Sequence, residues 1–323
     1  MLGSIMRGFS AVVLLTALTT HATAQGAADW PNKTVRLIVN FGPGGSADNT
    51  ARPFAERLSK SLGQQFVIEN RGGASGALGL EAVMKAAPDG YTFGITPSLS
   101  LVILPHLRKT PYDPLKDLVP VSIMTDGTLV FAVHPSLPVK SVPEFIDYAK
   151  KNPGKLSWGT AGVGSFGHIM AEAVKSAAGL DILHVPYRGG GESLADFLAG
   201  VVQIHADPNT MPHIAAGKAN LLAVLDRNRH PDYPKVPLLK EILPEIDYIV
   251  WFGVMAPPGT PAPIAKKFAE AIAKIAKEPD LEPILRKAAL APFGSTPEEM
   301  ADSIKKDHAK FGALIKKLDV KAE

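Results

Sequence analysis

Short apolar runs alternate with longer amphipathic segments along most of the chain. The apolar runs predict strands at residues 35–41, 65–69, 91–96, 119–125, 129–134, 156–160, 182–186, 202–206, 221–225 and 249–255. Apolar residues at helical spacing predict helices at residues 47–63, 77–87, 99–105, 141–152, 166–179, 191–200, 211–217, 262–278, 280–290 and 296–318. This alternation is typical of an α/β fold with mostly parallel sheets, in which ligands bind outside the carboxyl ends of the strands.

The first predicted strand leads directly into a glycine-rich turn and a helix. Val35–Phe41 has the continuous apolar character of a buried parallel strand, and Gly42–Gly45 allow a tight turn that a ligand can approach closely. Ser46 is a candidate N-cap for the helix that follows. Because free N–H groups at a helix N-terminus bind anions, this segment predicts a site for a carboxylate or a phosphate.

A second segment of the same design lies more than a hundred positions downstream. The predicted strand at 156–160 is followed by the loop Ala161-Gly-Val-Gly-Ser-Phe-Gly-His168 and then by a helix. Two such loops, far apart in the chain, indicate one loop in each of two lobes, facing each other across a cleft.

The lobes are expected to be joined by two crossings, near Asp126–Leu129 and Asp247–Phe252. The first lobe would then contain residues 30–126 and 252–323, and the second would contain residues 127–251. Two connecting segments are suited to hinge closure around a ligand.

The N-terminal residues 1–24 have the pattern of a secretory signal. A short n-region with one charge precedes the apolar segment Gly8–Thr20, which is too short for the ~20 residues of a membrane span. Ala22-Thr23-Ala24 matches an A-x-A cleavage site. The sequence therefore predicts export to the periplasm with cleavage after Ala24, and the alternative is a retained membrane anchor.

Composition excludes several classes of chemistry. The chain has no Cys, which rules out disulfides and thiolate catalysis. The net charge is +3, and no basic run with interleaved aromatic residues indicates nucleic-acid binding. The histidines are scattered, and His205 and Asp207 form only a single pair at a strand end, so no metal site is expected.

The glycine loops match one cofactor-binding motif and come close to one catalytic motif. Gly162, Gly164 and Gly167 fit the dinucleotide pattern G-x-G-x-x-G, but the acid that would bind the ribose is missing from the end of the next strand. General anion binding is therefore favoured, and no cofactor is expected. Ser165 and Ser46 are each one residue away from a hydrolase elbow G-x-S-x-G, which leaves a serine hydrolase as the alternative function.

Two polar side chains near the loops allow two interpretations each. His168 lies three residues after Ser165 on the same predicted helix, where a packed or capping role is expected more than a general base. Asp48 lies in the first turn of its helix, where it either stabilises the macrodipole or orients the loop and binds a donor of the ligand.

Seven short segments, in order, resemble the Bug family, the extracytoplasmic solute receptors of tripartite tricarboxylate transporters that are also called TctC-like. The resemblance covers nearly all of the chain after Trp30. The matching segments are Trp30-Pro31, 39–48 with Arg52, 67–73, 88–92, 159–165 with His168, 184–190 and 256–261. Departures from the family pattern, at Leu238 and at 217–221, lie outside the proposed site.

The resemblance implies a two-lobed periplasmic binding protein fold of type II, with two mostly parallel sheets joined by two hinge strands. It implies a non-enzymatic receptor, monomeric and without a cofactor, that delivers a small di- or tricarboxylate or an aromatic carboxylate to membrane transporter subunits. Backbone N–H groups and waters of the two loops would hold the carboxylate. The candidate ligand-binding residues are Phe41, Gly42, Pro43, Gly44, Gly45, Ser46, Asp48, Ser98, Thr160, Ala161, Gly162, Gly164, Ser165, Phe166, His168 and Asp207.

Overall fold

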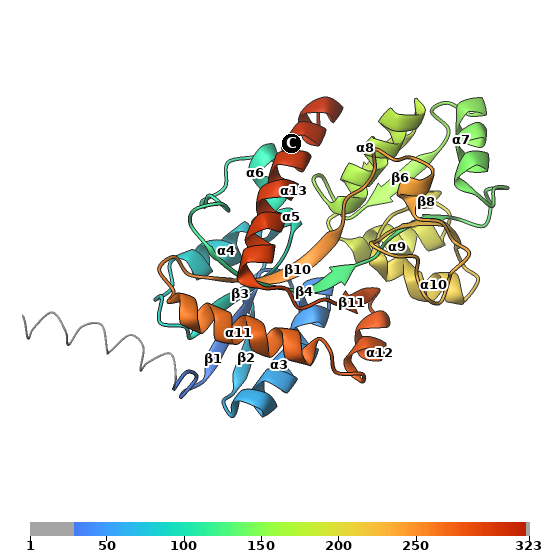
Figure 1. The fold of residues 1–323 in the computed structure, drawn as a ribbon. Coiled ribbons are helices and arrows are strands. Elements are labelled where there is room, and N and C mark those ends of the chain that lie inside the picture. The colour runs from blue at the N-terminus through green and yellow to red at the C-terminus, as the bar shows by residue number, and fades with distance from the viewer. Residues whose placement is uncertain (1–28, 321–323) are drawn as a thin grey trace, which may run out of the picture.

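A computed structural model describes residues 29–320 and shows two α/β lobes, each built on its own sheet (Figure 1). The predicted signal segment and its cleavage site lie outside the described residues. The strands are β1 (Val35–Val39), β2 (Phe66–Asn70), β3 (Thr92–Pro97), β4 (Val119–Gly127), β5 (Leu129–Val133), β6 (Ser157–Thr160), β7 (Leu183–Pro186), β8 (Ile204–His205), β9 (Asn220–Leu225), β10 (Val250–Ala256) and β11 (Leu290–Pro292).

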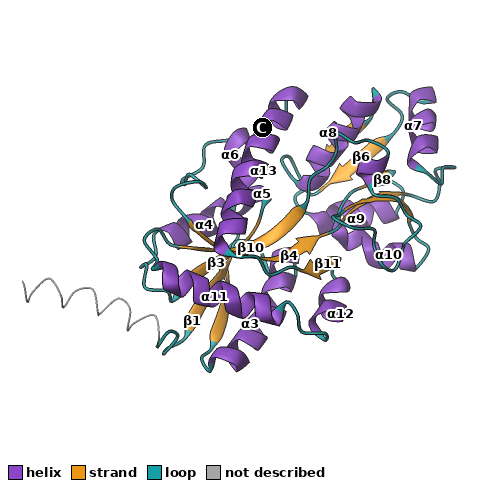
Figure 2. Ribbon diagram, viewed as in Figure 1, coloured by secondary structure: helices purple, strands orange, loops and turns teal. Residues whose placement is uncertain are grey.

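Helices cover both sheets (Figure 2). They are α3 (Ser46–Leu62), α4 (Ala77–Met84), α5 (Leu99–Val102), α6 (Leu104–Leu107), α7 (Val142–Lys151), α8 (Phe166–Ala178), α9 (Gly190–Leu198), α10 (Met211–Ala215), α11 (Ala262–Ile275), α12 (Leu281–Arg286) and α13 (Pro297–Leu318). Short 3₁₀ turns are η1 (Ala74–Gly76), η2 (Pro208–Thr210) and η3 (Leu239–Glu241). In the part of the chain that the structure describes, no helix combines the length and the apolar character that a bilayer crossing requires.

The two sheets are mixed, which corrects the expectation of mostly parallel sheets. In the first sheet the strand order is β11-β4-β10-β3-β1-β2, with parallel pairing only among β1, β2 and β3. In the second sheet the order is β7-β6-β8-β5-β9, and β5 is antiparallel to both of its neighbours. The cause is the passage between lobes: β4 runs toward the second lobe and β10 returns from it, so these two strands lie antiparallel.

The chain passes between the sheets at two places. Thr128 alone separates β4 from β5, and the return path lies between the end of β9 and the start of β10. Gly127 pairs with Val250, and so both belong to the first sheet. The proposed lobe boundaries at 126 and 252 stay a prediction.

Two predicted elements differ from those observed. The helix expected at 280–290 ends at Arg286, because Ala289 has φ 54 and the chain then pairs with β4 as β11. The helix expected at 99–105 is divided into α5 and α6 at Ile103, which has φ −110.

An aromatic cluster forms the centre of the first lobe. Phe268 of α11 lies 5.6 Å from Trp30, 5.6 Å from Phe66 and 4.6 Å from Phe93, between ring centroids. Phe268 and Phe93 are fully buried, and the Trp30 indole donates a hydrogen bond to the Gly90 carbonyl at 2.7 Å. This cluster joins the N-terminal end of the described chain and α11 to the first sheet.

We expect Phe268→Ala to lower the free energy of unfolding by about 3–5 kcal/mol, because it removes a buried ring and leaves a cavity. Phe293→Ala makes the same chemical change at a side chain that is 42% exposed, where the loss is about 1 kcal/mol or less. Urea unfolding of both variants measures the difference, and equal losses would contradict the assignment of the core.

Candidate functional site

The carboxyl ends of β1 and β3 lie at the edge of the first sheet that faces the second lobe. The register places them there, because Pro97 at the end of β3 pairs with Phe252 near the start of β10, and β10 begins opposite Gly127. In the second sheet, Thr160 at the end of β6 pairs with Pro186 at the end of β7. The loops that follow these strands carry the predicted site residues.

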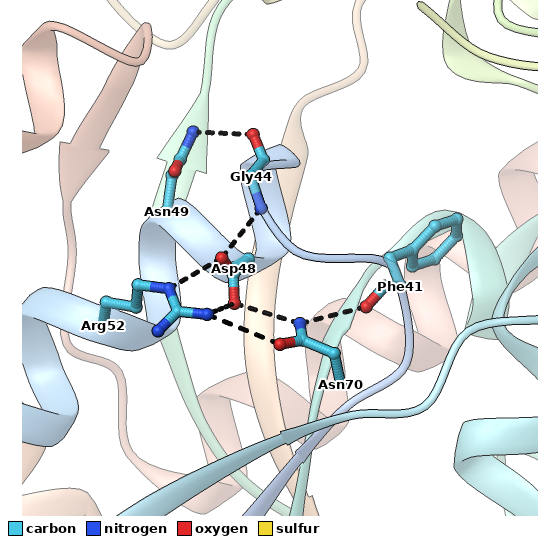
Figure 3. A network of polar contacts seen from close by, with 6 residues as sticks. All are labelled: Phe41, Gly44, Asp48, Asn49, Arg52 and Asn70. Carbon is cyan, nitrogen blue, oxygen red and sulfur yellow. Dashed lines mark hydrogen bonds and ion pairs between the residues drawn. The ribbon is translucent and has the colours of Figure 1, made fainter.

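In the first loop, the side chain of Asp48 organises the backbone (Figure 3). Its Oδ2 accepts the Gly44 N–H at 2.8 Å, and both of its oxygens accept hydrogen bonds from the Arg52 guanidinium, at 2.8 and 2.9 Å. The amide of Asn70 donates to Asp48 Oδ1 at 3.0 Å and to the Phe41 carbonyl at 3.1 Å. Both ends of the loop are therefore tied to one carboxylate.

The hydrogen bonds also set the charge of Asp48. Burial acts to raise the pKa of Asp48, but the donors from Arg52 and Gly44 outweigh it and hold the pKa below its ordinary value. Of the two roles considered for Asp48, orientation of the loop is the one that these contacts support.

The predicted N-cap role of Ser46 is wrong. The helix begins at Ser46 itself with Gly45 as N-cap, and no side-chain hydrogen bond caps it. Asp48, two residues further on, binds the loop N–H in its place. Among the described residues no partner is found for the N–H groups of Gly45, Ser46 and Ala47, which leaves these donors available at the helix N-terminus.

In the second loop, Ser165 is the N-cap of α8. Its hydroxyl accepts the backbone N–H of His168 at 3.2 Å, and the ring Nδ1 of His168 accepts the Gly164 N–H at 3.0 Å. The His168 ring stacks on His184 at 3.9 Å between centroids, and His184 Nε2 lies 2.7 Å from the Thr160 hydroxyl. One polar chain thus connects the loop to strands β6 and β7.

Both histidines of this stack are neutral at neutral pH. Burial lowers the pKa of His168 below its ordinary value. Burial and the neighbouring His168 lower the pKa of His184 to about 3. Because Nδ1 of neutral His168 accepts a hydrogen bond, its proton is on Nε2.

The two loops share one construction. Gly44 and Gly164 both have φ 78, and each donates its N–H to the side chain four residues later, Asp48 or His168. A positive φ of this size favours glycine. Each loop is therefore fixed by a glycine conformation and by one side chain of the helix that it precedes.

The cluster of His168, Glu172 and His184 has the residue types of a metal site but not the chemistry. Candidate ligand atoms lie within 4.8 Å of one another. However, Nε2 of His168 carries a proton, and Glu172 already accepts a hydrogen bond from Lys175 at 2.8 Å. The two rings are nearly parallel, at 8°, so their in-plane lone pairs do not converge on one point.

A serine hydrolase arrangement is not formed at Ser165. Its hydroxyl accepts a backbone N–H, and the His168 ring binds Gly164 rather than the hydroxyl. A nucleophile and its base must lie within hydrogen-bond reach of each other. The geometry therefore gives no support to a hydrolase that uses Ser165 as its nucleophile.

Four other predicted residues, Ser98, Phe41, Phe166 and Asp207, differ in how far their side chains are buried. Ser98 is fully buried, and its hydroxyl accepts the Trp251 backbone N–H at 3.3 Å, which fixes β10 against the end of β3. Phe41 is half-buried beside Gly76, and Phe166 is buried 6.3 Å from the ring of Phe311. Asp207 caps η2 by accepting the Asn209 N–H at 3.1 Å.

The structure also identifies two residues that the sequence analysis missed, Asn70 and His184. Each lies on a strand next to the one that precedes a glycine loop, so its position follows from strand pairing. Asn70 directly follows the predicted strand at 65–69, and His184 lies within the predicted strand at 182–186; these positions were the available signal.

The comparison with known proteins agrees with this geometry. Residues 50–320 match the family described as "Tripartite tricarboxylate transporter family receptor". Protein BugT of Bordetella pertussis is 38% identical over 259 residues, which cover 77% of this chain and 78% of BugT.

Two solved structures with bound acids have the same fold. The structure of R. palustris Rpa4515 with adipate is 34% identical, with a TM-score of 0.82, and covers 90% of this chain and 99% of its own. The structure of MatC from Rhodopseudomonas palustris with bound malate is 28% identical, with a TM-score of 0.78, and covers 88% of this chain and 100% of its own. The chain thus belongs to the receptor family of the tripartite tricarboxylate transporters.

Proposed function

We propose that the protein is a periplasmic receptor that binds a small organic carboxylate between its lobes and delivers it to a transporter of the tripartite tricarboxylate type. The observation that carries the proposal is the pair of equivalent glycine loops at the facing edges of the two sheets. The adipate and malate of two related structures are both dicarboxylates, which supports the ligand class. Export would require removal of the predicted signal after Ala24.

The carboxylate is bound by backbone N–H groups in this proposal. Gly45, Ser46 and Ala47 offer donors from the first loop, and Ala161 and Val163 offer donors from the second. A hydrogen bond to a charged group contributes about 1.5–3 kcal/mol. Several such bonds approach the ~8 kcal/mol of micromolar binding after ordering costs are subtracted.

Contacts between the lobes allow the two loops to act on one ligand. A Cβ placed on Gly164 would lie 2.5 Å from Leu107 at the end of α6, so the second loop touches the first lobe. A ligand that binds donors from both loops stabilises this closed arrangement more than an open one.

A thermal-shift screen of about a hundred organic acids tests the function, since saturating ligand raises the apparent stability by several kcal/mol. Short dicarboxylates, citrate-like acids, acidic amino acids and aromatic carboxylates form the panel. Incubation with generic esters and a covalent serine probe tests the alternative function. Ester turnover that Ser165→Ala abolishes would reject the receptor proposal.

Backbone recognition predicts that glycine substitutions in the loops are more harmful than loss of a hydroxyl. Gly44→Val and Gly164→Val place a β-branched residue at φ 78, and strain of roughly 1–3 kcal/mol lowers affinity by about tenfold to a hundredfold. Ser165→Ala removes an N-cap worth about 1 kcal/mol and weakens binding by about tenfold or less. Calorimetric titration with the acid found in the screen measures all three.

Gly217→Val is the matched control for backbone strain. Gly217 has φ 68 after α10, away from both loops, and no atom lies within 4 Å of its Cβ position. We expect it to lower stability and to leave affinity unchanged. If Ser165→Ala eliminates binding while Gly164→Val binds normally, recognition is by side chain and the backbone proposal is wrong.

The bond between His168 and Gly164 predicts a dependence of affinity on pH. Since burial lowers the pKa of His168 from its ordinary value, the ring is neutral at neutral pH, and affinity is expected to be unaffected by this group there. Further acidification protonates Nδ1, breaks the bond and weakens binding. Titrations of the wild type and of His168→Gln from pH 8 to pH 4 separate this effect from protonation of the ligand.

The glutamine variant lacks the titrating group and keeps an oxygen that can accept the Gly164 N–H. Its affinity is therefore expected to fall less steeply with acidification than that of the wild type, whereas His213→Gln on α10 follows the wild type. Parallel pH profiles of His168→Gln and the wild type would show that His168 does not control the loop.

A further inference from the structure

Asp207 lies at the edge of the second sheet where β6 and β8 end, beside the first turns of α8 and α9. It follows the carboxyl end of β8, one residue after Ala206, whose carbonyl lies 2.9 Å from the Cβ position of Gly167 in α8. Its Oδ2 lies 2.8 Å from the Cβ position of Gly190, the first residue of α9. A side chain at Gly190 would displace this oxygen, so the carboxylate lies against the backbone of α9.

The buried carboxylates of Asp48 and Asp126 each have a cationic partner, whereas the half-buried Asp207 has none among the described residues. Asp48 pairs with Arg52, and the carboxylate of Asp126 pairs with Arg227, whose Nη2 lies 3.2 Å from Oδ1. No lysine, arginine or histidine nitrogen of the described chain lies within 4.0 Å of Asp207. Burial raises the pKa of Asp207, and the single backbone donor from Asn209 opposes this.

Two acceptor atoms at this place lack a donor within the part of the chain that the structure describes. Asp207 Oδ1 accepts the Asn209 N–H, but Oδ2 accepts no hydrogen bond. The side-chain amide of Asn209 donates to the Gly190 carbonyl at 3.0 Å, and its Oδ1 is buried without a partner. A buried acceptor without a donor, as Asn209 Oδ1 is, costs free energy. Asp207 Oδ2 is not buried in this way, and it stays open to a donor that a ligand supplies.

We propose that Asp207 binds a hydrogen-bond donor on the ligand, so that the preferred ligand is an acid with an amino or hydroxyl substituent. The inference rests on the proposed function, because the glycine loops bind the carboxylate of the same molecule. A plain dicarboxylate would place a second negative charge beside Asp207, whereas an ammonium or hydroxyl group satisfies its free oxygen. Asp207 thus selects ligands by their donor, and the loops select them by their carboxylate.

Matched acids that differ only in the donor test the proposal by calorimetric titration. Succinate, L-malate and L-aspartate form one set, and glutarate, 2-hydroxyglutarate and L-glutamate form a second. In each set, the hydroxy and amino acids show whether a neutral or a charged donor is preferred. The O-methyl ether of malate keeps the oxygen and removes the donor.

The wild type is expected to bind a donor-bearing acid at least about tenfold more tightly than the unsubstituted acid of its set, as a hydrogen bond to a charged group implies. Asp207→Asn keeps the acceptor for the Asn209 N–H and is expected to reduce this preference to about threefold or less. Asp147→Asn makes the same change on the exposed surface of α7 and retains the full preference. Circular dichroism confirms that each variant is folded.

The possible results test the role of Asp207 and the receptor function separately. Equal or tighter binding of the unsubstituted acids by the wild type overturns the role of Asp207 and leaves the receptor function intact. The same conclusion follows if Asp207→Asn retains the preference, or if the methyl ether binds as well as malate. If none of these acids binds the wild type, and none of the larger panel does, the proposed function fails together with the inference.

Discussion

A hydrogen bond from a glycine N–H to the side chain four residues later holds each candidate loop in position. Gly44 is bound by Asp48 and Gly164 by His168, and both glycines have the same positive φ. Without these bonds, the glycine-rich segments would have many accessible conformations, and a ligand would have to order them. With them, the donors at each helix N-terminus are already directed before any ligand arrives.

The two loops reach this geometry with different charges. Asp48 is ionised, and its charge would oppose an anion bound nearby, but the Arg52 guanidinium covers both of its oxygens and neutralises the pair. His168 is neutral because it is buried, and so needs no counter-ion. In both loops, therefore, the side chain adds little net charge. The electrostatic field at the loop is determined by the backbone N–H groups, which favour an anion.

The sequence was sufficient for elements that depend on local patterns. The strand–glycine–helix pattern located both loops, because that pattern depends only on residues close together in the chain. The same reasoning failed at Ser46, because Asp48 competes for the loop N–H. The short strand β11 has three residues and forms only through pairing with β4, which no local pattern reveals.

The rest of the site depends on long-range pairing. Asn70 and His184 reach the loops because β2 and β7 lie beside the strands that precede them, and strand order cannot be read from a single sequence. The antiparallel direction of β4 and β10 follows from the path between lobes. The chain's own alternation of strands and helices predicted the fold class correctly, but not the antiparallel pairing of β4 and β10.

The C-terminal helix α13 contacts both lobes, so the lobes are connected by more than the two strand crossings (Figure 1). Asp307 accepts the Trp251 indole N–H at 2.9 Å in the first lobe, while Phe311 lies 6.3 Å from Phe166 of α8 in the second. A rotation about the two strand crossings alone would pull α8 away from α13. Opening of the cleft by such a rotation would separate the rings of Phe166 and Phe311, so the packing of α13 on α8 favours the arrangement in which the lobes are close together.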